Sequence, residues 1–186
     1  MSFKVLVIPE DPTYNGYILK PLVTKIMDSV EKPNAFVNVL TNPKLNGYEH
    51  AKASLESICE RYRHFDLFLF IPDNDCNKNR QPALNDLSEK LRGNGYKIAC
   101  VAAAEEVETW FLSAHKDKIE ADWQAVKQDC SVKENHFHPF LQRYGDNSPG
   151  GGREELMKEG LKRYRSIVTL NPELKFLIEE IKKLIA

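Results

Sequence analysis

The chain has 186 residues, of which 28% are charged, and a formal net charge of −1 at pH 7. This balance argues against a strongly basic nucleic-acid-binding domain, although it is compatible with local basic patches. No apolar run approaches the roughly 20 residues that a membrane helix needs, and the N-terminus lacks the features of a signal peptide. We therefore expect a cytoplasmic protein that does not interact with membranes.

The first 115 residues alternate between short apolar runs and helical patterns. Short apolar runs are typical of buried strands, whereas apolar residues at intervals of three and four indicate helices. In chain order, the expected elements are a strand at Phe3–Ile8, a helix at Thr13–Val30, a strand at Ala35–Leu40, a helix at His50–Tyr62, a strand at Phe65–Ile71, a helix at Ala83–Leu91, a strand at Tyr96–Ala103 and a helix at Glu105–His115. This order predicts a Rossmann-like α/β fold, with a mostly parallel four-stranded sheet and helices on both faces.

No further strand is expected after Ala121. The remaining elements are expected to be a helix at Asp117–Gln128, a loop at His136–Gly152, a helix at Arg153–Ile167 and a last helix that starts at Asn171-Pro172, with Asn as the N-cap. We thus expect a single domain over residues 1–186, with an α/β core at 1–115 and a helical C-terminal extension at 116–186.

The four cysteines are far apart in the sequence and show no Cys-x-x-Cys spacing. They are Cys59, Cys76, Cys100 and Cys130. This distribution argues against a zinc site, and reduced thiols are the expectation for a cytosolic protein.

Acidic residues follow three of the predicted strands. They are Glu10 and Asp11 after the first strand, Asp73 and Asp75 after the third, and Glu105, Glu106 and Glu108 after the fourth. In open α/β sheets, ligands bind beyond the carboxyl ends of the strands. Two carboxylates held there repel each other unless a cation or a proton lies between them. Because hard cations prefer oxygen ligands, the pattern predicts a site for Mg²⁺ (or Mn²⁺).

Four sequence segments together resemble the TOPRIM domain family. VLVIPED, followed downstream by LFLFIPDND, is similar to the TOPRIM pattern of a Glu after the first strand and an Asp-x-Asp after a later one. AAAEEVETWFL and the C-terminal KEGLKRYRSIVTLNPELKFLIEEI resemble small stand-alone TOPRIM-related proteins. These proteins are akin to nucleases of the overcoming-lysogenization-defect type and are often associated with ATPases in phage-defence loci. The resemblance spans most of the chain in order, through short motifs.

The resemblance implies a role for each matched acid. Glu10 is implied as a general acid/base or metal ligand, and Asp73 and Asp75 as ligands of Mg²⁺. Glu108 is implied as an auxiliary acid. The implied activity is metal-dependent cleavage of phosphodiester bonds in nucleic acid, by a component of a defence system.

The turn after the first strand departs from the TOPRIM pattern. Asp11 stands where the pattern has Gly, and Tyr14 or Asn15 stands where a second acid is expected. Pro9 and Pro12 flank the Glu and stiffen the turn. These departures leave an alternative open, in which the protein is a non-catalytic TOPRIM-like partner or regulatory subunit of an ATPase.

A third interpretation is a phosphotransfer domain of the response-regulator kind, with Asp73 as the phospho-acceptor. It also needs a Lys after a later strand, and no suitable one follows Tyr96–Ala103. We therefore rank it lowest of the three.

Basic residues near the acids are the expected contacts to nucleic-acid phosphates. Lys78 and Arg80 follow Asp75 closely and are well placed to steady a phosphate. Lys158 and Lys162 lie on a predicted helix, whose basic face either contacts phosphates or is simply solvated.

Overall fold

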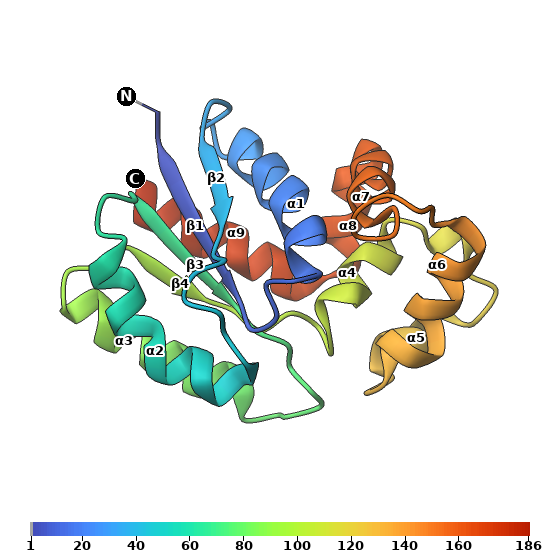
Figure 1. The fold of residues 1–186 in the computed structure, drawn as a ribbon, viewed down its shortest axis with the longest axis horizontal. Coiled ribbons are helices and arrows are strands. Elements are labelled where there is room, and N and C mark those ends of the chain that lie inside the picture. Colours follow the sequence, from blue (N-terminus) through green and yellow to red (C-terminus); the bar gives the residue numbers. More distant parts are fainter. Residues whose placement is uncertain (1) are drawn as a thin grey trace.

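Four parallel strands form the sheet at the centre of the structure, a computed structural model that describes residues 2–186 (Figure 1). The strands are β1 (Lys4–Pro9), β2 (Phe36–Val39), β3 (Leu67–Ile71) and β4 (Ile98–Cys100), in the spatial order β2-β1-β3-β4. All three neighbouring pairs are parallel. The predicted α/β class and four-stranded parallel sheet are therefore confirmed.

The strands are apolar on both faces because helices cover both sides of the sheet. In β1, Val5 and Val7 pack into one core, whereas Leu6 and Ile8 pack into the other. This alternation follows from the two-residue period of a strand. The first core includes residues from α1 (Asn15–Ser29), α4 (Val107–Ser113) and α9 (Pro172–Ile185), and the second includes residues from α2 (Gly47–Arg61) and α3 (Arg80–Gly93).

The central strands end in step at one edge of the sheet. Pro9, the last residue of β1, pairs with Ile71, the last residue of β3. An isolated parallel bridge between Asp73 and Ala103 continues the pairing of β3 with the chain that follows β4. This register brings the acidic segments after β1, β3 and β4 to the same edge.

The chain after residue 115 is helical, as expected, but its elements differ from the prediction. They are η1 (Lys116–Lys118), α5 (Trp123–Gln128), η2 (Lys133–Phe137), α6 (His138–Tyr144), α7 (Arg153–Gly160), η3 (Leu161–Arg163), α8 (Tyr164–Leu170) and α9. The helix predicted for 153–167 is thus interrupted by a 3-10 turn after Gly160.

The expected loop at His136–Gly152 is wrong over its first half, which is helical. Its apolar residues follow a helical period, because Phe137 and Phe140 lie three residues apart and Tyr144 four residues further on. Phe137 and Phe140 pack edge-on against Phe111 of α4 at 5.1 and 5.7 Å between ring centroids. The loop is confined to residues 145–152, in which Gly150, Gly151 and Gly152 all have positive φ.

The last helix returns to the sheet and completes one of its two cores. The buried apolar residues of α9 join the core that contains Val5 and Val7. Trp110 of α4 donates a hydrogen bond from Nε1 to Oε1 of Glu173 at 2.9 Å. The predicted start of α9 at Pro172 is confirmed, but the side chain of Asn171 makes no capping bond and donates instead to Oγ of Ser113 at 2.7 Å.

Two of the four cysteines form a disulfide between Cys76 and Cys130. The expectation of four reduced thiols is therefore wrong for this pair, whereas Cys59 and Cys100 are free and buried. Cys76 and Cys130 are 54 residues apart and meet only through the tertiary fold, so their spacing carried no signal. Within residues 2–186, no helix is both long enough and apolar enough to cross a membrane.

Two glycines in helices provide a matched test of the packing between α4 and α7. A Cβ at Gly160 would overlap the Cβ of Ala114, whereas a Cβ at Gly93 would meet no atom within 4 Å. We expect Gly160→Ala to lower the free energy of unfolding by about 1–3 kcal/mol through overpacking. Gly93→Ala is expected to leave it unchanged or raise it by up to about 1 kcal/mol. Urea unfolding followed by circular dichroism measures both, and an equal response of the two variants would contradict the packing described.

Candidate metal centre

Three carboxylates converge beyond the carboxyl ends of β1 and β3. Glu10, Asp73 and Asp75 each offer one oxygen, and the three oxygens lie within 4.8 Å of one another. Glu10 directly follows Pro9 of β1, and the two aspartates follow β3. The convergence expected from the sequence is therefore present, and we call these three residues the acidic triad.

Asp73 is the buried member of the acidic triad and is held by the backbone of α4. Its side chain is 8% exposed, and its Oδ1 accepts a hydrogen bond from the N–H of Val107 at 2.8 Å. This N–H belongs to the first turn of α4, where backbone donors have no partner within the helix. The start of α4 thus fixes one oxygen of Asp73 and leaves the other for a ligand.

Asp75 is the exposed member, and its position depends on a tight turn. Asp75 and Cys76 both have positive φ, at 52° and 53°. The N–H groups of Asn74 and Asp75 donate to the backbone carbonyl of Glu105 at 3.0 Å. The N–H of Cys76 donates to the side chain of Glu105, at Oε2, with a distance of 2.6 Å. Glu105 therefore shapes the loop rather than joining the triad.

Arg80 contacts Asp75 and restrains it from the side of α3. Its Nη2 donates to Oδ2 of Asp75 at 2.8 Å. The guanidinium lies over the ring of Tyr48 at 3.6 Å, and only 9% of the Arg80 side chain is exposed. Arg80 is therefore placed to orient Asp75, and much of it is already covered by protein.

The environments of Asp73 and Glu10 raise the pKa of both carboxyl groups. Burial raises the pKa of Asp73 well above its ordinary value, and the neighbouring carboxylates Glu108 and Glu10 raise it further. Burial also raises the pKa of Glu10, with a further contribution from Asp75. A bound cation reverses this electrostatic cost, because it favours the ionised form of each ligand.

Glu108 lies deeper than the triad and adjoins it. It is 0% exposed, and neither of its carboxylate oxygens has a hydrogen-bond partner within residues 2–186. Its Oε1 lies 3.7 Å from the Nζ of Lys133, a distance at which charges attract. Burial raises the pKa of Glu108, whereas the charge of Lys133 lowers it.

Lys133 and Arg153 are cations beside the triad that the sequence did not single out. Burial alone lowers the pKa of Lys133, but the carboxylates of Glu108 and Asp73 outweigh this effect and raise it. Arg153 is 8% exposed, lies 4.7 Å from the ring centroid of Tyr14, and interacts electrostatically with Glu108. Both belong to segments distant in sequence from the acids, so no local motif could have identified them.

The basic residues expected to contact nucleic acid occupy different environments. Lys78 is exposed in the loop that follows Asp75. Lys158 of α7 is engaged with Glu154 and Glu155 at 2.8 Å each. Lys162 is exposed in η3. Of the four expected contacts, only Arg80 is joined directly to the triad.

The residues of the acidic triad fit a hard divalent cation. All three ligands are carboxylate oxygens, which suit Mg²⁺ and Mn²⁺ better than softer metals. Glu10 has a buried Oε2 without a hydrogen-bond partner among the described residues. This orphaned oxygen and the raised pKa values of Glu10 and Asp73 are the features expected of a site that holds a cation.

Asp73→Asn separates metal binding from folding. The amide keeps an acceptor for the Val107 N–H but removes the negative charge. Replacing a residue that only supports a metal ligand typically weakens binding roughly tenfold or more, and we expect loss of the ligand itself to weaken Mn²⁺ binding further. The metal-free variant should be no less stable than the wild type, because the amide resembles the favoured protonated acid. Calorimetric titration and urea unfolding measure the two effects, with Asp86→Asn on the exposed face of α3 as the matched control. Unchanged Mn²⁺ affinity in Asp73→Asn would exclude Asp73 as a ligand.

The raised pKa of Glu106 makes the free energy of unfolding depend on pH. Burial raises its pKa to about 7 from an ordinary value of 4.5, so the folded state binds a proton that the unfolded state has lost between these values. The protonated Glu106 side chain therefore carries no penalty in the folded state below pH 4.5, and the folded state loses stability from this group as the pH rises towards 7. Glu106→Gln removes this titration, so its stability relative to the wild type should rise between pH 5 and pH 7.5. Urea unfolding of both metal-free proteins at these two pH values provides the test, and a constant difference would contradict it.

No protein-family model, curated protein or solved structure matches this chain. The interpretation of the site therefore rests on the geometry and chemistry of its own residues. These show an acidic triad with the composition of a metal-binding site at the carboxyl edge of a parallel sheet.

Proposed function

We propose that this protein is a Mg²⁺- or Mn²⁺-dependent enzyme that cleaves phosphodiester bonds in nucleic acid. The observation that carries the proposal is the convergence of Glu10, Asp73 and Asp75 within 4.8 Å at the edge of the sheet where ligands bind. The resemblance of the segments around these residues to the TOPRIM pattern supports the same activity, and a role in phage defence belongs to the same proposal.

In this proposal the triad holds the cation, with Asp73 fixed by Val107 and Asp75 by Arg80. A bound Mg²⁺ or Mn²⁺ supplies Lewis acidity towards a phosphodiester oxygen and activates water as the nucleophile. Glu10 has a raised pKa and an oxygen without a hydrogen-bond partner among the described residues, which suit it to accept and return a proton. Glu108 acts as the auxiliary acid and balances the charge of Lys133.

Lys133 is the cation best placed to approach a phosphate at the triad. It is half-buried, and its charge is maintained by the surrounding carboxylates. The ammonium group, paired with Glu108, would add positive charge beside a divalent cation held by the triad and so favour an anionic substrate. Lys78, in the loop next to Asp75, is placed to contact a second phosphate of the same strand.

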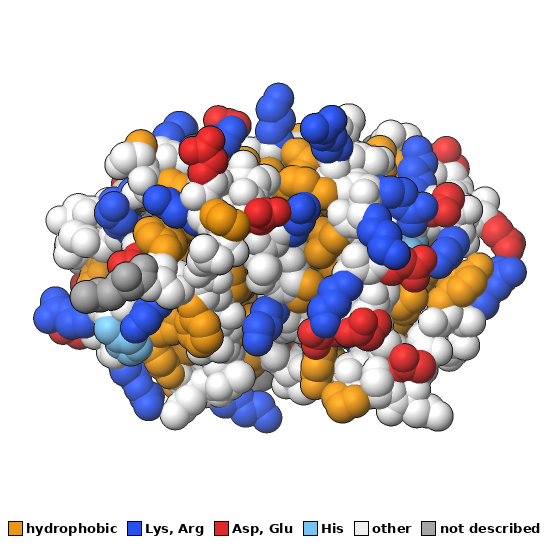
Figure 2. Space-filling model, turned by 90° about the horizontal axis from the view of Figure 1, so that it is seen from above, with side chains coloured by type: hydrophobic (Ala, Val, Ile, Leu, Met, Phe, Trp, Pro, Cys, Tyr) orange, Lys and Arg blue, Asp and Glu red, His pale blue; other side chains and the backbone are white. Residues whose placement is uncertain are grey.

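The face of the molecule in Figure 2 has Lys and Arg side chains interspersed with Asp and Glu. This face offers separate cations rather than a continuous basic track, so phosphate contacts on it would be individual. At the site itself, substrate binding in this proposal depends on the metal ion and on Lys133, which is half-buried beside Glu108.

The activity is tested with plasmid, linear and single-stranded DNA and with RNA, in Mg²⁺ or Mn²⁺. We expect cleavage by the wild type, and its loss by at least roughly 100-fold in Asp73→Asn and Glu10→Gln, because each removes a charge that acts in the transition state. Asp86→Asn should retain full activity. Lys133→Met is expected to lose activity that Lys133→Arg partly keeps.

Cleavage that is unchanged in Asp73→Asn would overturn the proposed function. Metal binding by the wild type without cleavage of any of these substrates would favour the alternative of a non-catalytic ATPase partner. A specific observation motivates that alternative: Tyr14 or Asn15 stands where the resembled pattern has an acid, and Asn15 is 1% exposed with an Oδ1 that has no hydrogen-bond partner among the described residues.

A further inference from the structure

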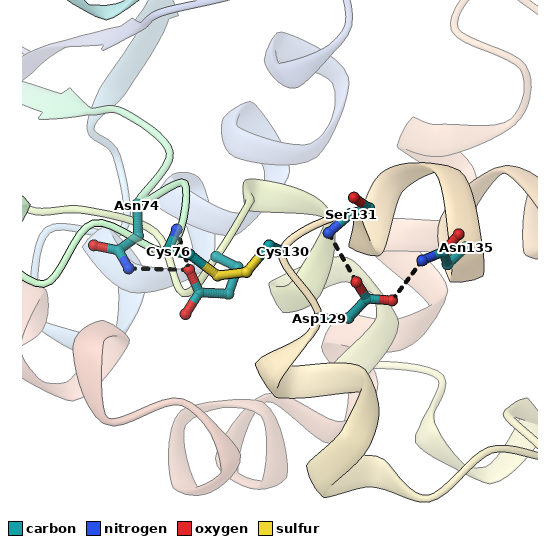
Figure 3. The surroundings of a disulfide bond; sticks show 7 residues. Asn74, Cys76, Asp129, Cys130, Ser131 and Asn135 are labelled. Atoms are coloured by element: carbon teal, nitrogen blue, oxygen red, sulfur yellow. Dashed lines mark hydrogen bonds between the residues drawn. A yellow bond between two sulfur atoms is a disulfide. The ribbon is translucent and has the colours of Figure 1, made fainter.

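The disulfide joins the loop of the acidic triad to a segment that is distant in sequence. Cys76 directly follows Asp75, and Cys130 lies just after α5, three residues before Lys133. Their Cα atoms are 5.6 Å apart (Figure 3). One covalent bond therefore connects the chain that carries a triad ligand with the chain that carries the nearby cation.

The loop after β3 that carries Asp75 and Cys76, which we call the triad loop, has a conformation that requires support. Positive φ values are uncommon for residues other than glycine, and Asp75 and Cys76 adopt them in succession. The hydrogen bonds to Glu105 provide part of the support, including one from Nδ2 of Asn74 to Oε2 at 3.0 Å (Figure 3). The disulfide adds to this support, because it fixes the side chain of Cys76, the second residue with positive φ.

The segment on the other side of the disulfide is itself ordered by local hydrogen bonds. Asp129 accepts from the N–H of Ser131 at 2.8 Å and from Nδ2 of Asn135 at 2.9 Å (Figure 3). The N–H of Lys133 donates to Oε2 of Glu106 at 2.7 Å. The disulfide therefore joins the triad loop to a turn that has hydrogen bonds of its own.

The disulfide is accessible to reductants, whereas the two free thiols are not. Cys76 and Cys130 are both exposed. Cys59 and Cys100 are buried, and burial raises the pKa of these thiols to about 12 and about 11. Since the thiolate is the attacking form in disulfide exchange, neither free cysteine is suited to rearrange the bond, and its state is set by external thiols.

We propose that the Cys76–Cys130 disulfide is a redox switch that controls metal binding at the acidic triad. A dithiol reductant breaks the S–S bond and supplies two electrons and two protons, which yields two cysteine thiols and the oxidised dithiol. The loop at Asp75 then relaxes from its strained conformation and withdraws a ligand from the triad. This inference rests on the proposed function, because it assigns regulation to the same site.

The test compares Mn²⁺ binding by the oxidised protein with binding after reduction and anaerobic removal of the dithiol. We expect the Kd measured by calorimetry to rise roughly tenfold on reduction, within the usual range of coupling between two sites. The variant with both Cys76→Ser and Cys130→Ser should match the reduced wild type and should not respond to dithiol. Because coupling is reciprocal, saturating Mn²⁺ should make the disulfide harder to reduce by the same factor.

Equal Kd values for the oxidised and reduced proteins would overturn the redox switch and leave the proposed function standing. Failure of the oxidised protein to bind Mn²⁺ would overturn both. Circular dichroism of the reduced protein provides the folding control. A native spectrum with weakened binding supports the switch, whereas global unfolding on reduction would overturn it and assign the disulfide a purely structural role.

Discussion

The hydrogen bond from the N–H of Val107 to Asp73 connects the central strand of the sheet to the start of α4, and the candidate site depends on it. It orients a buried carboxyl group whose pKa is raised by burial and by the neighbouring carboxylates Glu108 and Glu10. It also sets the start of α4, the helix that carries Glu108 next to the triad and Trp110 into the core. The candidate metal site and the hydrophobic core are therefore both connected to the start of α4.

Cations on three separate elements balance the excess of acid around this attachment. Arg80 belongs to α3, Lys133 to η2 and Arg153 to α7. Each is at least partly buried: Arg80 pairs with Asp75, whereas Lys133 and Arg153 both interact with Glu108. The remaining repulsion is concentrated on Asp73 and Glu10. The fold thus holds its like charges at a stability cost that a divalent ion can offset, which is a common compromise at functional sites.

The sheet and the acidic triad could be predicted because both follow from local patterns. Apolar runs such as Leu67–Ile71 mark buried strands, and parallel strands bring their carboxyl ends to one edge. The helix at His138–Tyr144 was missed because its polar residues outweighed the spacing of its aromatic ones. Lys133 and the Cys76–Cys130 disulfide could not be predicted at all, since their partners are fixed only by tertiary packing.

The return of α9 to the sheet has a consequence for the order of folding during synthesis. The core that contains Val5 and Val7 also contains Leu177 and Ile181, which the ribosome adds more than 160 residues later. Until α9 emerges, a nascent chain carries an uncovered apolar surface on one side of its sheet, a state prone to aggregation. The opposite core, built by α2 and α3, requires no segment beyond Ala102 and can close much earlier.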